Sequence, residues 1–143
     1  MPLVIQNHLT HLLGFTYSVL PSVYLGIPLI DNSLRNASWN SLLSNFRKRL
    51  SLWTFRALNL PERLVLLKSI LQALPIYTFS ALAAPSSIHN TLRSIQRIFL
   101  WQGIKEGRKI SLVSWQKICN PKKVGGLGLR DPAILNKVLS AKI

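Results

Sequence analysis

The chain has 143 residues and carries 18 Lys and Arg against only four acidic residues, a formal net charge of +14 at pH 7. At most four of these cations can pair one-to-one within the chain, so the others need water or an external polyanion. Nucleic acid is the partner that this charge favours, with a solvated surface or anionic lipid as the alternatives. The single cysteine, Cys119, excludes an internal disulfide and a multi-cysteine zinc site.

Hydrophobic residues make up 48% of the chain, which is long enough to bury a core. Prolines and polar residues interrupt its most apolar region, so we expect no membrane-spanning helix and no stable membrane insertion. The amino-terminal stretch lacks a basic region and carries His8 and His11 within its apolar residues, which argues against a secretory signal peptide. We expect a single domain over residues 1–143 that is not secreted.

The first elements are predicted between residues 20 and 54. The sequence "LPSVYLGIPL", residues 20–29, combines strand-forming residues with Gly26 and two prolines, which predicts a short strand entering a turn. From Ser38, a plausible N-cap, the pattern becomes helical. One face of this helix carries Trp39, Leu42, Leu43, Phe46, Leu50 and Trp53. Lys48 lies opposite that face, and Arg47 and Arg49 flank it.

A second helix is predicted over "NLPERLVLLKSILQAL", with Pro61 in its first turn. Its leucines cover about half the circumference and leave a thin polar stripe of Lys68, Ser69 and Gln72, so this helix should be central and largely buried. Pro75 should kink or interrupt it, and Pro85 should end the segment that follows.

The next helix, "IHNTLRSIQRIFLW", should follow Ser86 or Ser87 as its cap. It places Arg93 and Arg97 one turn apart, away from its apolar face. This unfavourable spacing of like charges is explained by an anion across both arginines or by a solvated face. The sequence "GIKEGRKISLV" predicts a hairpin-like excursion or basic loop, and "SWQKIC" a short helix capped by Ser114.

The stretch "GGLGLRD", residues 125–131, has neither the spacing of a P-loop nor that of a dinucleotide-binding loop. We predict a tight turn in which Gly125 and Gly126 permit positive φ and Gly128 permits close packing, before Asp131 and Pro132 start the last helix. A weak anion site is the alternative, because Lys122, Lys123 and Arg130 would surround exposed backbone amides.

Catalytic and metal chemistry find little support in the sequence. The four acids are scattered, so neither a two-metal nor an acid–base site is predicted, and no serine or cysteine triad is evident. His8 and His11 lack a third ligand nearby, so no zinc site is predicted. Trp39 and Trp53 are expected in the core rather than as base-stacking platforms. The residues predicted to contact phosphate are Arg47, Lys48, Arg49, Arg93, Arg97, Lys122 and Lys123.

The landmarks "YLGIPL", "RIFLWQG", "GGLGLRD" and "NKVLSAK" follow one another in an order that resembles plant LINE-type (non-LTR) reverse transcriptases, in the region downstream of the palm. The resemblance runs from about Leu20 to the end. It implies a last palm element over residues 1–30, primer-grip-like at Tyr24, Leu25 and Gly26, and a helical thumb and connection over residues 31–143. One departure is Pro61-Glu62, where the family often has a small residue and Gly.

The resemblance implies binding of an RNA/DNA template-primer through its backbone. It implies Mg²⁺ only for the complete enzyme, whose palm aspartates lie upstream, so this chain is expected to need no cofactor and to be no enzyme on its own. A separately supplied palm domain would be its protein partner, in the nucleus or a plant mitochondrion. The alternative is a retroelement remnant with no present role, and a weaker one is a basic protein on an anionic membrane surface. The expected fold is mainly α, a thumb-like helical bundle with a short β element near Tyr24.

Overall fold

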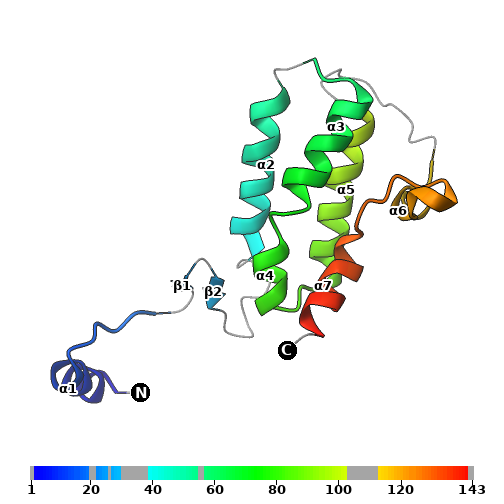
Figure 1. Cartoon of the computed structure of the whole chain (residues 1–143). Coiled ribbons are helices and arrows are strands. Elements are labelled where there is room, and N and C mark those ends of the chain that lie inside the picture. Colours follow the sequence, from blue (N-terminus) through cyan, green and yellow to red (C-terminus); the bar gives the residue numbers. More distant parts are fainter. Residues whose placement is uncertain are drawn as a thin grey trace. The chain divides into compact units, whose positions relative to one another are not determined.

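The computed structural model describes residues 2–19, 22–25, 27–29, 39–54, 57–102 and 113–141. Within these residues the chain is mainly helical, as predicted, with one two-stranded antiparallel sheet (Figure 1). The chain divides into two compact units, Met1–Ser38 and Trp39–Ile143, called here the amino-terminal unit and the helical unit. None of the described helices is long and apolar enough to cross a membrane.

The amino-terminal unit contains helix α1, Leu3–Leu13, and the strands β1, Ser22–Tyr24, and β2, Ile27–Leu29. Gly14 ends α1 in the left-handed conformation, with φ 68°, and its N–H donates to the carbonyl of Thr10. Tyr24 pairs with Ile27 across the hairpin, and the predicted short strand and turn are confirmed. No residue of α1 is buried.

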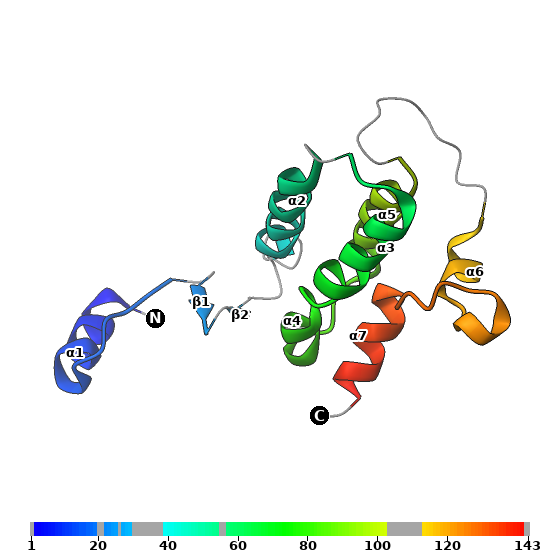
Figure 2. The ribbon, with the colours of Figure 1, turned by 45° about the horizontal axis from the view of Figure 1, so that its top comes forward.

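The helical unit consists, over its described residues, mainly of α-helices of varied length, joined by a π-helical turn and a 3₁₀ turn. These are α2 (Asn40–Thr54), α3 (Leu60–Leu66), the π-helical η3 (Leu67–Leu71), α4 (Ile76–Ala81), α5 (Ser86–Gln102), α6 (Trp115–Cys119), the 3₁₀ turn η4 (Lys122–Val124) and α7 (Pro132–Ser140). α3 packs on α5, and α7 packs on both α4 and α5 (Figures 1 and 2). Ser38 lies outside the described residues, as do residues 103–112 of the predicted hairpin-like excursion or basic loop, which runs to Val113.

The core of the helical unit confirms the predicted apolar face of α2. Trp39 packs edge-on against Phe79 of α4, with ring centroids 6.2 Å apart, and Trp53 packs against Phe99 of α5 at 5.9 Å. Both tryptophans are therefore core residues, as predicted. Four large apolar side chains from η3 and α5 complete the centre: Leu67, Leu71, Leu92 and Leu100.

The second predicted helix is not regular throughout. Pro61 lies in its first turn, as predicted, and Asn59 and Glu62 form a reciprocal capping box. After Leu66, however, the chain widens into the π-helical turn η3. Pro75 has no N–H to donate to a preceding turn, so a regular α-helix cannot run through it. Gln72 is consequently buried rather than part of an exposed polar stripe.

Helix α5 starts one or two residues earlier than a cap at Ser86 or Ser87 predicts. It begins at Ser86, and the carbonyl of Pro85 accepts from the N–H groups of Ile88 and His89. Ser86 and Ser87 therefore lie within the first turn instead of capping it. Ser114 precedes α6 as predicted, although its side chain makes no capping hydrogen bond.

Asn136 anchors α7 to the segment that joins α4 and α5. It is only 4% exposed. Its Nδ2 donates to the carbonyls of Phe79 and Leu82, at 3.0 Å each, and its Oδ1 accepts from the N–H of Ala84 at 2.8 Å. The Nε2 of His89 lies 3.1 Å from the same oxygen. One buried amide thus satisfies backbone groups at a helix end that would otherwise lack partners.

Candidate nucleic-acid interface

The exposed face of α2 carries Arg47, Lys48 and Arg49, all three open to solvent. Their position follows from the helical period, because the opposite face supplies the buried Leu42, Leu43 and Phe46. Within the described residues none of the three cations forms an ion pair, so their positive potential is not neutralised internally. Their contact with phosphate stays a prediction.

Arg93 and Arg97 are in different situations. The guanidinium of Arg93 faces Asp131, with Nε 2.9 Å from Oδ2 and Nη2 3.0 Å from Oδ1. In the part of the chain that the structure describes, this is the sole ion pair. Arg97 is exposed one turn further along. Arg93 already donates to Asp131 and Asn90, which leaves two of its five guanidinium N–H groups without an acceptor among the described residues, so Arg97 is the more available of the two to a phosphate. Contact of either arginine with phosphate stays a prediction.

Asp131 connects three helices through one carboxylate. It caps α7 by accepting from the N–H of Ala133 at 2.9 Å, and it accepts from Nε1 of Trp115 at 3.0 Å as well as from Arg93. Burial would raise the pKa of Asp131, but these hydrogen bonds outweigh burial and lower it. The hydrogen bond to Asp131 in turn raises the pKa of Arg93. Asp131 and Pro132 start α7 as predicted.

The other two tryptophans, whose roles the sequence does not determine, differ in burial. Trp115 is buried and bound to Asp131, so it belongs to the core. Trp101 is half-buried, and its Nε1 has no hydrogen-bond partner among the described residues. The buried Trp115 ring is thus not an open platform for a base, whereas Trp101 keeps part of its surface accessible.

Most backbone amides around the glycine-rich turn already have acceptors within the chain. Five successive N–H groups, from Val124 to Gly128, already donate to carbonyls of Pro121, Lys122, Pro121, Ile118 and Asn120 respectively. These five amides are therefore not available to an anion, and the alternative of an anion site finds no support from them. The confirmed tight turn uses Gly125 and Gly128 at φ 85° and 68°. Close packing belongs to Gly126 instead, since a Cβ there would collide with the carbonyl of Asn120.

Lys122 and Lys123 lie in η4, immediately before this turn, and both are exposed. The primer-grip-like residues lie on the hairpin of the amino-terminal unit. Tyr24 and Leu25 are exposed there, and Leu25 has a left-handed φ of 51°, while Gly26 lies outside the described residues. The predicted contacts of these residues with template-primer stay predictions.

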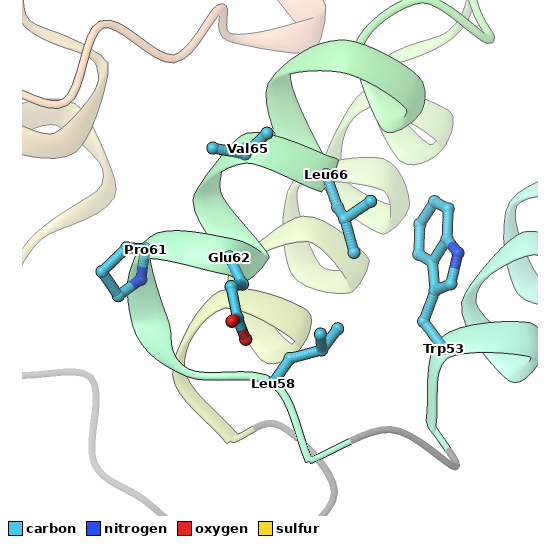
Figure 3. A pocket seen from close by; sticks show the side chains of 6 residues that line it. All are labelled: Trp53, Leu58, Pro61, Glu62, Val65 and Leu66. Atoms are coloured by element: carbon cyan, nitrogen blue, oxygen red, sulfur yellow. The ribbon is translucent and has the colours of Figure 1, made fainter.

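Two hollows in the helical unit carry no evident chemistry. The first, of about 420 Å³, lies between α2 and α3 and is lined mainly by apolar side chains (Figure 3). Its one carboxylate, Glu62, already accepts from the N–H of Asn59 at 2.9 Å. The second, of about 640 Å³, holds the Arg93–Asp131 pair and Cys119. Burial above all raises the pKa of Cys119 to about 11, which leaves this thiol a poor nucleophile at neutral pH.

The residues described contain no group of three His, Cys, Asp or Glu side chains that could hold a metal ion. Of the four acids, Glu62 and Asp131 are engaged at helix starts.

The sequence does not indicate which distant residues meet. Periodicity places Lys68 on a polar stripe and Lys122 in a separate loop, yet these two cations approach one another closely enough to interact. Asp131 is predicted as a cap, but not as the partner of Arg93 and Trp115. Periodicity assigns residues to faces of single helices, and it carries no signal for contacts between elements so far apart in the chain.

Comparison with known proteins gives two plant relatives from Arabidopsis thaliana. A protein named "Putative ribonuclease H protein" is 34% identical over 117 residues, covering 82% of this chain and 19% of that protein. A protein named "Uncharacterized mitochondrial protein" is 41% identical over 71 residues, covering 49% of this chain and 46% of that protein. No family model and no solved structure matches the chain. The chain is homologous to both plant proteins and spans less than half the length of either.

Proposed function

We propose that the chain derives from the region downstream of the palm in a plant LINE-type reverse transcriptase, and that it binds template-primer nucleic acid through the sugar–phosphate backbone. The ordered landmarks from "YLGIPL" to "NKVLSAK" support this origin. Homology to a plant protein named for ribonuclease H and to a mitochondrial plant protein supports a retroelement source more broadly. In this proposal residues 1–30 correspond to the last palm element and residues 31–143 to thumb and connection.

The observation that carries the binding proposal is the uncompensated positive surface of the helical unit. Its exposed cations include Arg47, Lys48, Arg49, Arg97, Lys122 and Lys123, none with an acidic partner among the described residues. Cations of this kind attract a polyanion by neutralising phosphates and releasing condensed counterions, without reading base sequence. A helical surface that holds a duplex by its backbone needs no more specific chemistry.

The proposal includes no catalysis by this chain alone. Polymerisation requires clustered carboxylates to hold Mg²⁺, whereas Glu62 and Asp131 hold helix ends and the other two acids are far apart in sequence. The catalytic aspartates would belong to a palm domain, either joined to this region or supplied separately. A palm would also cover apolar side chains of the amino-terminal unit such as Leu3, Val4 and Phe15, which are more than 70% exposed.

Binding is tested by fluorescence anisotropy with a labelled DNA primer annealed to RNA, in two unrelated sequences at several salt concentrations. We expect similar affinity for both sequences and a linear fall of log K with log salt, by about 0.9 per phosphate contacted. Lack of binding at low salt would overturn the proposal, and Mg²⁺-dependent extension of the primer by the chain alone would overturn its non-catalytic part.

A matched pair of double variants tests the role of α2. Lys48→Gln with Arg49→Gln removes two charges from its exposed face, and Lys117→Gln with Lys137→Gln removes two from exposed positions of α6 and α7. The salt slope is the slope of log K against log salt concentration. We expect the α2 double variant to reduce this slope by about one for each phosphate that it no longer neutralises, and the control double variant to change it less. Equal effects would assign binding to net charge rather than to α2.

The second candidate is a retroelement remnant with no present role. The observation that favours it is the apolar surface of the amino-terminal unit, where α1 has no buried residue. A remnant that lacks a required partner should melt broadly or aggregate, and should bind no template-primer. A cooperative thermal transition by circular dichroism, together with salt-dependent binding, would exclude this candidate.

A further inference from the structure

We propose that Lys68, Lys122 and Arg130 form a binding site for one phosphate group, where η3 meets the glycine-rich turn. This inference rests on the proposed function in one respect: it takes the phosphate group to come from a nucleic-acid backbone. The phosphate chemistry itself is independent of that source, because free phosphate or pyrophosphate presents the same oxygen acceptors.

A small hollow of about 220 Å³ marks this place in the helical unit. It is lined by Lys68, Gln72, Ala73, Ile76, Gly128 and Arg130. A water molecule occupies about 30 Å³ of liquid volume, so the hollow has room for a phosphate group with some of its water. Arg130 is exposed and Lys68 half-buried, so both charged groups are accessible to a ligand in solution.

The backbone around the hollow fixes the positions of these cations. The π-helical turn η3 carries Lys68, and turns of this kind occur frequently at functional sites. The buried side chain of Gln72 donates to the carbonyl of Arg130 at 3.2 Å and so ties the loop to η3. Both lysines lie beside Gly128, since a Cβ built there would be 3.7 Å from Nζ of Lys68 and 3.9 Å from Cγ of Lys122, ordinary contact distances.

The electrostatics of the hollow are those of an anion site. No acidic residue lines it, and no hydrogen bond or ion pair engages Lys68 among the described residues. Burial, and then the nearby charge of Lys122, lower the pKa of Lys68. The adjacent acid, Asp131, is directed to Arg93 and Trp115. Like charges held together without a counter-charge are unfavourable, and phosphate oxygens would relieve their repulsion with charge-assisted hydrogen bonds.

The site is tested on the full chain with pyrophosphate and, separately, with the RNA–DNA template-primer. Lys68→Gln with Arg130→Gln is compared with Lys117→Gln plus Lys137→Gln, which removes the same charge elsewhere. We expect the first pair to weaken pyrophosphate binding about tenfold or more in calorimetry, and to lower the salt slope for template-primer by about one. The control pair should leave pyrophosphate binding unchanged. Lys68→Arg with Arg130→Lys should retain it.

Chemical shifts in the unmodified chain give a readout that does not depend on folding of a variant. Pyrophosphate should shift the backbone amide of Gly128 and the side-chain amide of Gln72, while amides of α2 stay in place. Unmoved Gly128 and Gln72 signals, or equal losses in both variant pairs, would overturn the site. Pyrophosphate bound in the hollow without template-primer binding would support the site and sink the proposed function. Template-primer binding that is the same in the Lys68→Gln plus Arg130→Gln variant as in the unmodified chain would support the proposed function and contradict the site.

Discussion

The carboxylate of Asp131 accepts hydrogen bonds from α5, α6 and the first turn of α7, so a single side chain couples three helices. Its partner Arg93 is partly accessible to solvent, whereas the Asp131 side chain is almost covered. Interactions of a covered carboxylate with a charged partner are stronger than those of exposed pairs, because water competes less. Asp131 should therefore matter more for stability than Glu62, the other acid that the structure describes.

We predict that Asp131→Asn lowers the free energy of unfolding by about 1.5–3 kcal/mol, since Arg93 loses its anionic partner while asparagine can still cap α7. Glu62→Gln is the matched control. It makes the same chemical change at an exposed cap, where glutamine preserves the capping box, and should cost less than about 0.5 kcal/mol. Urea unfolding measures both, and equal losses would contradict the special role of Asp131.

The lowered pKa of Asp131 also sets a pH dependence. The unfolded chain binds this proton near the ordinary value of about 3.9, and the folded chain binds it only at lower pH. The stabilisation is therefore present above about pH 4 and is lost as the pH falls through the folded pKa. Melting temperatures between pH 6 and pH 2 should fall more steeply for the wild-type chain than for Asp131→Asn. Parallel curves would contradict this assignment.

Residue roles can be predicted from the sequence where they depend on close neighbours. Asp131 before Pro132 is a local helix-start signal, and the structure confirms it. The bidentate hydrogen bonding of the Arg93 guanidinium to the same carboxylate cannot be predicted, because the two residues lie 38 positions apart. For the same reason the sequence alone predicts that Arg93 faces phosphate like Arg97.

At the scale of elements, two neighbouring glycines of the glycine-rich turn are needed for different physical reasons. Gly125 has φ 85° with open space where a Cβ would be, so alanine there strains only the backbone, at about 1–2 kcal/mol. At Gly126 an added Cβ meets the carbonyl of Asn120, and the turn must move. We predict that Gly126→Ala costs at least about 1 kcal/mol more than Gly125→Ala in urea unfolding. Equal costs would mean that the turn adapts freely.

The element boundaries show what periodicity can and cannot supply. The apolar face of α2 is predicted correctly because its spacing of large residues fits a regular helix over four turns. The second helix is predicted as regular up to Leu74, whereas it widens at Leu67. A π turn shifts the faces by one residue, so it moves Gln72 inward without leaving a sign in a pattern that is already rich in leucine.

At the scale of the whole molecule, every member of the hydrophobic core among the described residues belongs to the helical unit. We predict that a chain lacking residues 1–38 keeps a cooperative thermal transition, with a melting temperature within a few degrees of the full chain. Circular dichroism measures this, and removal of residues 132–143 is the contrasting deletion, which should abolish the transition. Loss of cooperativity in the first deletion would contradict the independence of the helical unit.

Composition and ordered landmarks predict the class of fold and motivate the proposed role, since net charge and a helical period are properties of the chain itself. The meeting of Lys68 with Lys122 and Arg130 cannot be predicted, because it depends on how η3 and the glycine-rich turn pack. Similarity to longer plant proteins supports the proposed retroelement origin. The positions of the proposed phosphate contacts depend on how distant elements pack, and a local sequence pattern does not contain that information.

The anchoring of Asn136 has a consequence for how the protein is made. The carbonyls of Phe79 and Leu82 and the N–H of Ala84 form hydrogen bonds with the side chain of Asn136, which the ribosome adds more than fifty residues later. During synthesis, the joint between α4 and α5 therefore stays open until α7 has left the exit tunnel. A nonsense codon shortly before Asn136 would remove the partner of these backbone groups between α4 and α5. We expect such a truncation to lower the stability of the helical unit as much as a substitution in its core.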